Sequence, residues 1–211
     1  MTEQLAFYFD SSACTGCKAC MSACKDKNDL PVGMNFRKVL EYGGGSWVPH
    51  AQYPEYMVPN NVYYYSISSA CMHCDSALCM ESCPAKAIVK RSDGLVDIDP
   101  DKCIGCRYCE WACPYGGPQF DETKGVMRKC DFCRDLLAAG QNPACVDACV
   151  MRAIDFGNKD ELVAKYGNVN SIEPWPDPDV TEPSIVITPH RHAHRSGDGT
   201  GEIVSAAEVV Q

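Results

Sequence analysis

The sequence has no apolar run approaching the roughly 18 residues that a membrane-spanning helix needs. It also lacks a basic and then apolar N-terminal segment, so we expect no cleaved signal peptide. Excess positive charge is missing as well, because 19 Lys and Arg residues face 28 Asp and Glu residues, a formal charge of −9. Nucleic acids and anionic membrane surfaces select basic patches, so we expect neither as a partner.

Motifs for independent catalysis are also missing. The chain has no Walker loop, no GxGxxG fingerprint and no order of Ser, His and Asp that favours a catalytic triad. No Cys-x-x-Cys is followed by His, which excludes attachment of a c-type haem. We therefore predict that the chain is not an enzyme by itself.

Cysteine, in contrast, is abundant, at 16 of 211 residues. All 16 fall into four runs of four, with none left over. The gaps are 2, 2 and 3 residues in runs one and three, 2, 4 and 3 in run two, and 2, 11 and 3 in run four. In sequence order the runs are Cys14, Cys17, Cys20 and Cys24; Cys71, Cys74, Cys79 and Cys83; Cys103, Cys106, Cys109 and Cys113; and Cys130, Cys133, Cys145 and Cys149.

Disulfides and zinc explain these runs poorly. Disulfides replace a core mainly in chains much shorter than 211 residues, and cysteines so close in sequence rarely bridge without strain. Structural zinc favours Cys-x-x-Cys pairs, whereas three close thiols and a fourth three residues on do not divide into two pairs. A zinc-stabilised interaction scaffold stays the remote alternative, and metal content distinguishes it.

The bacterial iron–sulfur pattern is Cys-x2-Cys-x2-Cys-x3-Cys, often followed by Pro, and its fourth Cys binds a second cluster. Runs one and three match every gap. Pro84 and Pro114 follow runs two and three, whereas Lys25 and Val150 take that place after runs one and four. We predict four [4Fe–4S] clusters, with all 16 cysteines as iron ligands. The spacing alone does not fix which runs pair.

Positive side chains lie in or near the cysteine runs. Each oxidised cluster with its four thiolates carries roughly −2, so these cations either help to set reduction potentials or form solvated surface. The residues are Lys18, Lys25, Arg107, Lys124, Arg128, Lys129 and Arg134.

Apolar segments between the runs predict a mixed α+β fold. Residues 5–9 read as a strand that leads into run one, and residues 87–89 and 95–98 flank Asp93-Gly94 as a hairpin. Strand, cluster loop, helix, hairpin and cluster loop form the layout of a bacterial two-cluster ferredoxin. Residues 31–67 lack cysteine, and we expect a loop insertion there with a strand at 62–65.

The C-terminal quarter carries fewer signals. Residues 152–156 favour a strand, and Asn158 can cap a helix, with Glu161 at its third position, that stops at Gly167. A proline-rich stretch follows, and from residue 189 we expect an extended tail that lies along a partner or is mobile.

The chain resembles the iron–sulfur subunits of the dimethyl sulfoxide reductase group, within the molybdopterin oxidoreductase family. The likeness spans nearly the whole length. It is carried by the motifs Cys14-Thr15-Gly16-Cys17-Lys18, Cys103-Ile104-Gly105-Cys106-Arg107-Tyr108-Cys109, Ala112-Cys113-Pro114-Tyr115-Gly116, Glu122-Thr123-Lys124-Gly125, Lys129-Cys130-Asp131 and Asp155-Phe156-Gly157.

The resemblance implies two bacterial-type two-cluster ferredoxin domains, one inserted in the other. The outer domain would be 1–30 plus 118–157, the insertion 31–67, the inner domain 68–117, and the C-terminal helix and tail 158–211. It also implies four ligand sets. The first set is Cys14, Cys17, Cys20 and Cys149; the second is Cys24, Cys130, Cys133 and Cys145; the third is Cys71, Cys74, Cys79 and Cys113; the fourth is Cys83, Cys103, Cys106 and Cys109. Some relatives carry Trp where this chain has Cys106, and assemble a [3Fe–4S] cluster there; with Cys106 in place, we expect four cubanes.

In that family the chain relays single electrons in anaerobic respiration, between a membrane subunit that oxidises quinol and a molybdopterin catalytic subunit. The first set would face the catalytic subunit and the fourth the quinol site. The complex would be peripheral to the membrane, on the extracytoplasmic face if the chain is exported with its catalytic partner, although the cytoplasmic face fits equally. Related subunits for polysulfide, thiosulfate, arsenate or organic substrates stay open. Those of formate dehydrogenase usually end in a membrane helix, and those of nitrate reductase are much longer.

Other conspicuous residues have simpler explanations. His190, His192 and His194 fit a solvated tail better than a metal site. His73 lies inside run two, where we expect it to pack or hydrogen-bond near a cluster. Aromatic residues beside the runs are expected to shield the clusters: Tyr108, Trp111 and Tyr115.

Overall fold

The N-terminal strand β1 (Leu5–Asp10) is the centre of the main sheet. In this computed structural model, which describes residues 4–206, β1 pairs antiparallel with β8 (Ile154–Asn158) and parallel with β9 (Ile185–Thr188). Alternate side chains of a strand point to opposite faces. Phe7 and Phe9 therefore join the large core with the cysteines, while Ala6 and Tyr8 pack towards Leu162. The predicted strands at 5–9 and 152–156 are thus confirmed, the second starting two residues later.

Leu162 belongs to helix α6 (Lys159–Tyr166), which also agrees with its prediction. The Asn158 side chain accepts a hydrogen bond from the backbone N–H of Asp160 and so caps the first turn. The helix ends at Gly167, whose φ of 94° suits glycine. Local capping signals were therefore enough to place this element.

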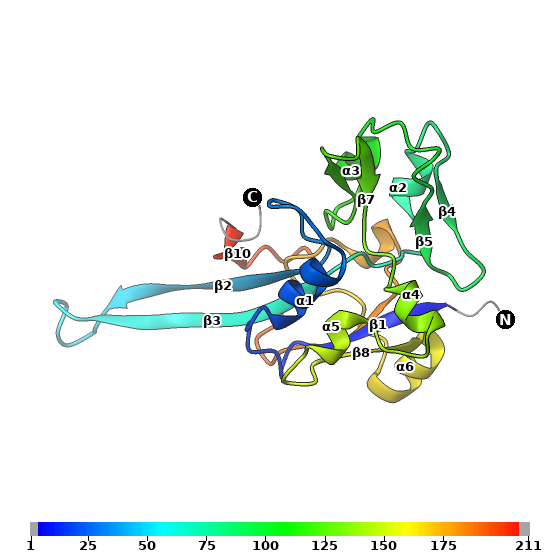
Figure 1. The fold of residues 1–211 in the computed structure, drawn as a ribbon. Coiled ribbons are helices and arrows are strands. Elements are labelled where there is room, and N and C mark those ends of the chain that lie inside the picture. The colour runs from blue at the N-terminus through cyan, green and yellow to red at the C-terminus, as the bar shows by residue number, and fades with distance from the viewer. Residues whose placement is uncertain (1–3, 207–211) are drawn as a thin grey trace.

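Two short hairpins and two helices form the upper lobe in Figure 1. The predicted hairpin is present as β4 (Ile88–Lys90) and β5 (Val96–Ile98), with Gly94 in its turn. The second hairpin, β6 (Gln119–Asp121) and β7 (Val126–Arg128), packs on the same small core through Phe120 and Met127. The helices of this lobe are α2 (Leu78–Glu81) and α3 (Tyr108–Ala112).

The segment expected as a loop insertion forms a long β-arm, so the expected strand at 62–65 is confirmed within a longer strand, whereas the expectation of a loop is wrong. Strands β2 (Lys38–Pro49) and β3 (Met57–Ser69) pair antiparallel and extend far from the body (Figure 1). Residues 43–45, a glycine triplet of a kind that is unusual in a strand, lie within β2. A Cβ at Gly44 would stand 2.7 Å from the carbonyl oxygen of Thr200 and from the hydroxyl of Tyr63. These glycines therefore admit a third strand and a tyrosine ring at close range.

The third strand of the arm is β10 (Gly201–Ile203), which pairs antiparallel with β2. The expected free tail is thus wrong for this part of residues 158–211, because it binds the chain's own arm. Glu173 accepts hydrogen bonds from the Thr200 hydroxyl at 2.7 Å and the Tyr42 hydroxyl at 3.0 Å. These bonds hold the start of β10 against β2. Strand β9, which lies just before the expected tail, was not predicted either.

The remaining helices are short: α1 (Ala19–Lys27), α4 (Arg134–Ala138), α5 (Ala144–Asp147) and the 3-10 turn η1 (Pro178–Val180). Within residues 4–206, no helix is long and apolar enough to cross a membrane.

Candidate cluster sites

The main sheet brings runs one and four together. Run one follows β1 and run four precedes β8, and these two strands pair antiparallel. Cys149 therefore meets run one across more than 120 residues of sequence. Four thiols, those named above as the first set, line one cavity whose other walls include Val39 and Ile154: Cys14, Cys17, Cys20 and Cys149.

The second set lies beside the first, and all four of its cysteines are buried. Helix α1 carries Cys24 one turn after Cys20, and α5 carries Cys145. Burial raises the pKa of the Cys24 thiol to about 12; Arg37 opposes the rise, and the nearby charges of Cys145 and Cys133 add to it. Burial also raises the pKa of Cys130 well above its usual value, with Cys24 as the next cause. These four thiols are therefore electrostatic neighbours.

The third set joins the end of β3 to the upper lobe. Cys71 and Cys74 follow β3, Cys79 lies on α2, and Cys113 directly follows α3. Burial raises the pKa of Cys79 to about 12, with further contributions from the charges of Cys71 and Cys113. Cys74 also has a pKa of about 12, from burial and then Cys71.

The fourth set lines a cavity in the upper lobe: Cys83, Cys103, Cys106 and Cys109. Its apolar walls include Ile88, Ile98 and Met127, from β4, β5 and β7. Burial raises the pKa of Cys109 to about 11, and the charges of Cys103 and Cys83 add to the rise.

The fourth cysteine of every run accepts a hydrogen bond from the residue four positions later. The donor is a backbone N–H for three of them: Ala87 to Cys83 at 3.3 Å, Gly117 to Cys113 at 3.4 Å and Ala153 to Cys149 at 3.2 Å. Cys24 lies inside α1, so the backbone N–H of Asn28 bonds the Cys24 carbonyl, and its side-chain amide approaches the sulfur at 3.6 Å. Donors aimed at sulfur favour the thiolate form, so these contacts offset part of the cost of burying a charged thiolate ligand.

Buried thiols make cluster binding depend on pH. With pKa values of about 11 for Cys14 and about 12 for Cys24 and Cys79, these ligands are protonated at neutral pH when no iron is bound. Iron binds the thiolates, so each of these three ligands releases a proton when its cluster binds. Lower pH therefore favours the cluster-free chain. We expect an iron chelator to bleach the visible absorbance at least tenfold faster at pH 6 than at pH 9. Equal bleaching rates at the two pH values would contradict this linkage.

The structure bears on the two alternative roles of the cysteines, disulfide bonds and zinc sites. All 16 are free thiols, so the structure contains no disulfide among them. Within the described residues, no group of three or more Cys, His, Asp and Glu side chains could hold a single metal ion. The four ligands of a cubane bind four separate irons, so they need not converge on one point. The sulfur-lined cavities of the first and fourth sets therefore fit clusters better than zinc ions.

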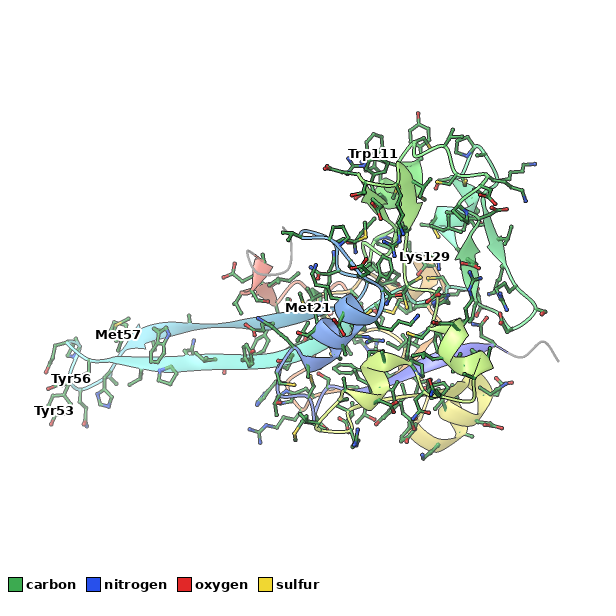
Figure 2. All side chains as sticks on the ribbon, in the orientation of Figure 1. Met21, Tyr53, Tyr56, Met57, Trp111 and Lys129 are labelled. Carbon is green, nitrogen blue, oxygen red and sulfur yellow. The ribbon has the colours of Figure 1, made fainter. Side chains whose placement is uncertain are left out.

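Several of the cations flagged from the sequence pair with carboxylates. Arg128 pairs with Asp121 at 2.9 Å, Arg107 with Glu110 at 2.7 Å, and Arg134 with Asp97. Lys129 is an exception, because it is buried and its ammonium donates to the carbonyl oxygens of Val96 and Cys130. Figure 2 shows it between the upper lobe and the body.

Sequence reasoning missed another buried cation, Arg37. It lies 13 residues after Cys24, within the expected insertion. No spacing signal marks it, because its position depends on how β2 and β3 return to the cysteine loops.

The histidine and aromatic residues differ in part from expectation. His73 is buried, accepts a hydrogen bond from the Val96 N–H at 3.1 Å and packs edge-on against Phe132, as expected of a packing residue. The shielding role is wrong for Tyr108 and Trp111, which are 52% and 74% exposed. Tyr115 is half-buried, with its hydroxyl 2.8 Å from that of Thr181.

The tail histidines lie on the arm. His190 stacks on Tyr65 with ring centroids 5.7 Å apart, and the His194 ring lies 5.3 Å from that of Tyr63. His192 is exposed and lies beside His190. His190 and His194 are thus aromatic contacts between the segment that leads into β10 and strand β3 of the arm.

Cysteine-lined sites on short hairpins and helices define a ferredoxin-type iron–sulfur protein with an electron-transfer role. The family model described as a 4Fe-4S dicluster domain matches residues 62–159, and that described as a 4Fe-4S binding domain matches residues 5–26.

Curated relatives name the family. The sequence is 47% identical to the B subunit of the anaerobic dimethyl sulfoxide reductase of Escherichia coli K12, over 99% of this chain and 100% of that protein. It is also 47% identical to the B subunit of the Haemophilus influenzae enzyme of the same name, over 98% and 100%. The protein NrfC of Escherichia coli K12 is 39% identical over 72% of this chain and 64% of its own length. This protein belongs to the family of dimethyl sulfoxide reductase iron–sulfur subunits.

Proposed function

We propose that the chain is a non-catalytic subunit that relays single electrons from a membrane quinol-oxidising subunit to a molybdopterin catalytic subunit. The most fitting complex is an anaerobic reductase of the dimethyl sulfoxide reductase type. Four [4Fe–4S] clusters, one in each of the four cysteine sets, would supply the one-electron chemistry when bound. The observation that carries this proposal is that the first and fourth sets each line one cavity. The mutual electrostatic influence of the thiols in the second and third sets supports the other two sites.

Contacts between neighbouring sets support a linear order. The charge of Cys145, of the second set, acts on Cys20 of the first. The charge of Cys71, of the third set, acts on Cys130 of the second. The third and fourth sets share one small apolar core, which includes Cys79 and Cys109. The order is therefore first, second, third, fourth.

We propose two ferredoxin units, one inserted in the other. The β1–β8 pairing supports an outer unit that holds the first and second sets. The upper lobe supports an inner unit that holds the third and fourth sets. Because Met127 of β7 lines the fourth cavity, the inner unit extends to about residue 128 and not only to 117.

Exposed apolar residues at both ends of this order support two different partners. Beside the first set, Cys17 is exposed and Val150 is 69% exposed. Beside the fourth set, Ile104 is 68% and Trp111 is 74% exposed, and Figure 2 shows Trp111 on the outer side of the upper lobe. We assign the Val150 end to the catalytic subunit and the Trp111 end to the quinol-oxidising subunit. Such a complex would be peripheral to the membrane, and we favour the extracytoplasmic face, reached by co-export with the catalytic subunit.

Two charge substitutions test this arrangement in the complex purified from its host. Trp111→Glu should slow reduction of the clusters by quinol at least tenfold, because burying an unpaired carboxylate in an interface costs more than about 1.4 kcal/mol. Val150→Glu should leave quinol reduction of the clusters intact but slow electron delivery to the terminal substrate by a similar factor. Both should keep the dithionite-reduced EPR spectrum of the wild type.

Val180→Glu is the matched control, since Val180 is 47% exposed and belongs to neither end. It should leave both rates unchanged. Exchange of the two phenotypes would reverse the assignment of the ends. Absence of molybdenum and tungsten from an active complex would contradict the proposed partner.

A further inference from the structure

Arg37 is a buried charge without a carboxylate partner. It is 3% exposed and stands directly before β2. Among residues 4–206, no Asp or Glu oxygen lies within ion-pairing distance of it, whereas Arg128, Arg134 and Lys27 each have such a partner. Burying an unpaired guanidinium is costly unless another negative group compensates. The compensating group must therefore lie elsewhere.

Three contacts fix the guanidinium. Its Nη1 donates to the Ser68 hydroxyl at 3.0 Å and to the Ser68 carbonyl at 3.3 Å. Its carbon lies 4.6 Å from the centroid of the Phe7 ring, a cation–π contact. Its Nη2 is buried and has no hydrogen-bond partner. The Phe7 ring thus holds one face of the guanidinium, and Ser68 binds Nη1. The N–H groups of Nη2 are left for another acceptor.

The negative groups around Arg37 are thiolates of two sets. Burial lowers the pKa of Arg37, but the charges of four cysteines more than offset this and raise it above its usual value: Cys145, Cys20, Cys130 and Cys24. Three belong to the second set, whereas Cys20 belongs to the first. Ser68 extends the link, because its hydroxyl is 3.4 Å from the Cys20 sulfur as well as 3.0 Å from Arg37.

We infer that Arg37 is a fixed positive charge shared by the first and second cluster sites, which stabilises their reduced states and raises their reduction potentials relative to the other two. This rests on the proposed function. Reduction adds one negative charge to a site, and a buried cation stabilises that charge far more than a solvated one does. An arginine keeps its charge at any ordinary pH, so the effect would not vary with pH.

The test is a redox titration of the intact complex, followed by EPR, for the wild type and three variants. Arg37→Gln should lower two of the four potentials, each by at least a tenfold change in the equilibrium constant for reduction, or about 59 mV for one electron. Arg37→Lys keeps the charge and should restore most of the shift. Arg91→Gln removes the same charge from an exposed residue that pairs with Asp93 at 3.1 Å, and should shift none.

The outcomes separate this inference from the proposed function. A wild type without four clusters would refute the proposed function. Four clusters in Arg37→Gln with unshifted potentials, or four equal shifts, would overturn the role of Arg37 alone. Arg37→Met is a second neutral variant in case Arg37→Gln assembles poorly. Loss of clusters from both neutral variants, while Arg37→Lys keeps all four at wild-type potentials, indicates that the charge is needed for assembly and overturns the role in setting potentials.

Discussion

Replacing Cys145 with alanine is expected to reduce quinol-driven turnover of the complex by about a hundredfold or more. Cys145 belongs to the second set, which has the first set on one side and the third on the other. Losing a ligand of an inner set interrupts the relay, while dithionite still reaches the exposed ends. We expect three clusters with about 12 irons, from four per cubane, and near-normal reduction of the end clusters by dithionite.

The matched control is His192→Ala, a truncation to alanine at an exposed residue of the tail that belongs to none of the four cysteine sets. It should change neither turnover nor iron content. If Cys145→Ala kept full turnover with three clusters, electrons would bypass the second set and the linear order would be wrong.

Truncation of Phe132 to alanine is expected to cost about 3–5 kcal/mol of stability. Its ring is 1% exposed and stacks on Phe7 at 4.0 Å between centroids. It also packs edge-on against His73 at 5.6 Å and Phe156 at 6.2 Å. The ring thus joins the run-four loop to β1, β8 and run two, and its removal leaves a cavity where these meet.

Thermal unfolding of the cluster-loaded complex under anaerobic conditions measures this cost. We expect the midpoint to fall by about 10 °C, from roughly 2–4 °C per kcal/mol in a chain of this size. Tyr53→Ala is the control, because Tyr53 is 56% exposed on the turn of the arm (Figure 2) and should shift the midpoint little. A shift below about 2 °C for Phe132→Ala would show that the ring is not structural.

Elements with local signals were predictable from the sequence. Asn158 and Gly167 mark the ends of α6, and Asp93-Gly94 marks the turn between β4 and β5. Strands β9 and β10 carry no such signal, because each is defined by a distant partner, β1 or β2. Strand β2 was not predicted because its glycines are unfavourable in a strand. They leave room for Thr200 and Tyr63, which come close only in the folded chain.

The features of the candidate sites also differ in how far the sequence predicts them. Short-range spacing was enough to mark the 16 cysteines as candidate ligands, because the pattern of each run is local in the sequence. Whether runs one and four lie together depends on the pairing of β1 with β8, which spacing does not encode. Arg37 reaches the thiols by the same kind of long-range packing.

Metal and acid-labile sulfide content per chain, on complex purified from its host without oxygen, tests the central claim most directly. Four cubanes predict about 16 irons and about 16 sulfides per chain. About eight irons would mean that two of the four cysteine sets do not hold cubanes. About four zinc ions per chain with little iron and no sulfide would contradict the account, and would make the protein a structural scaffold.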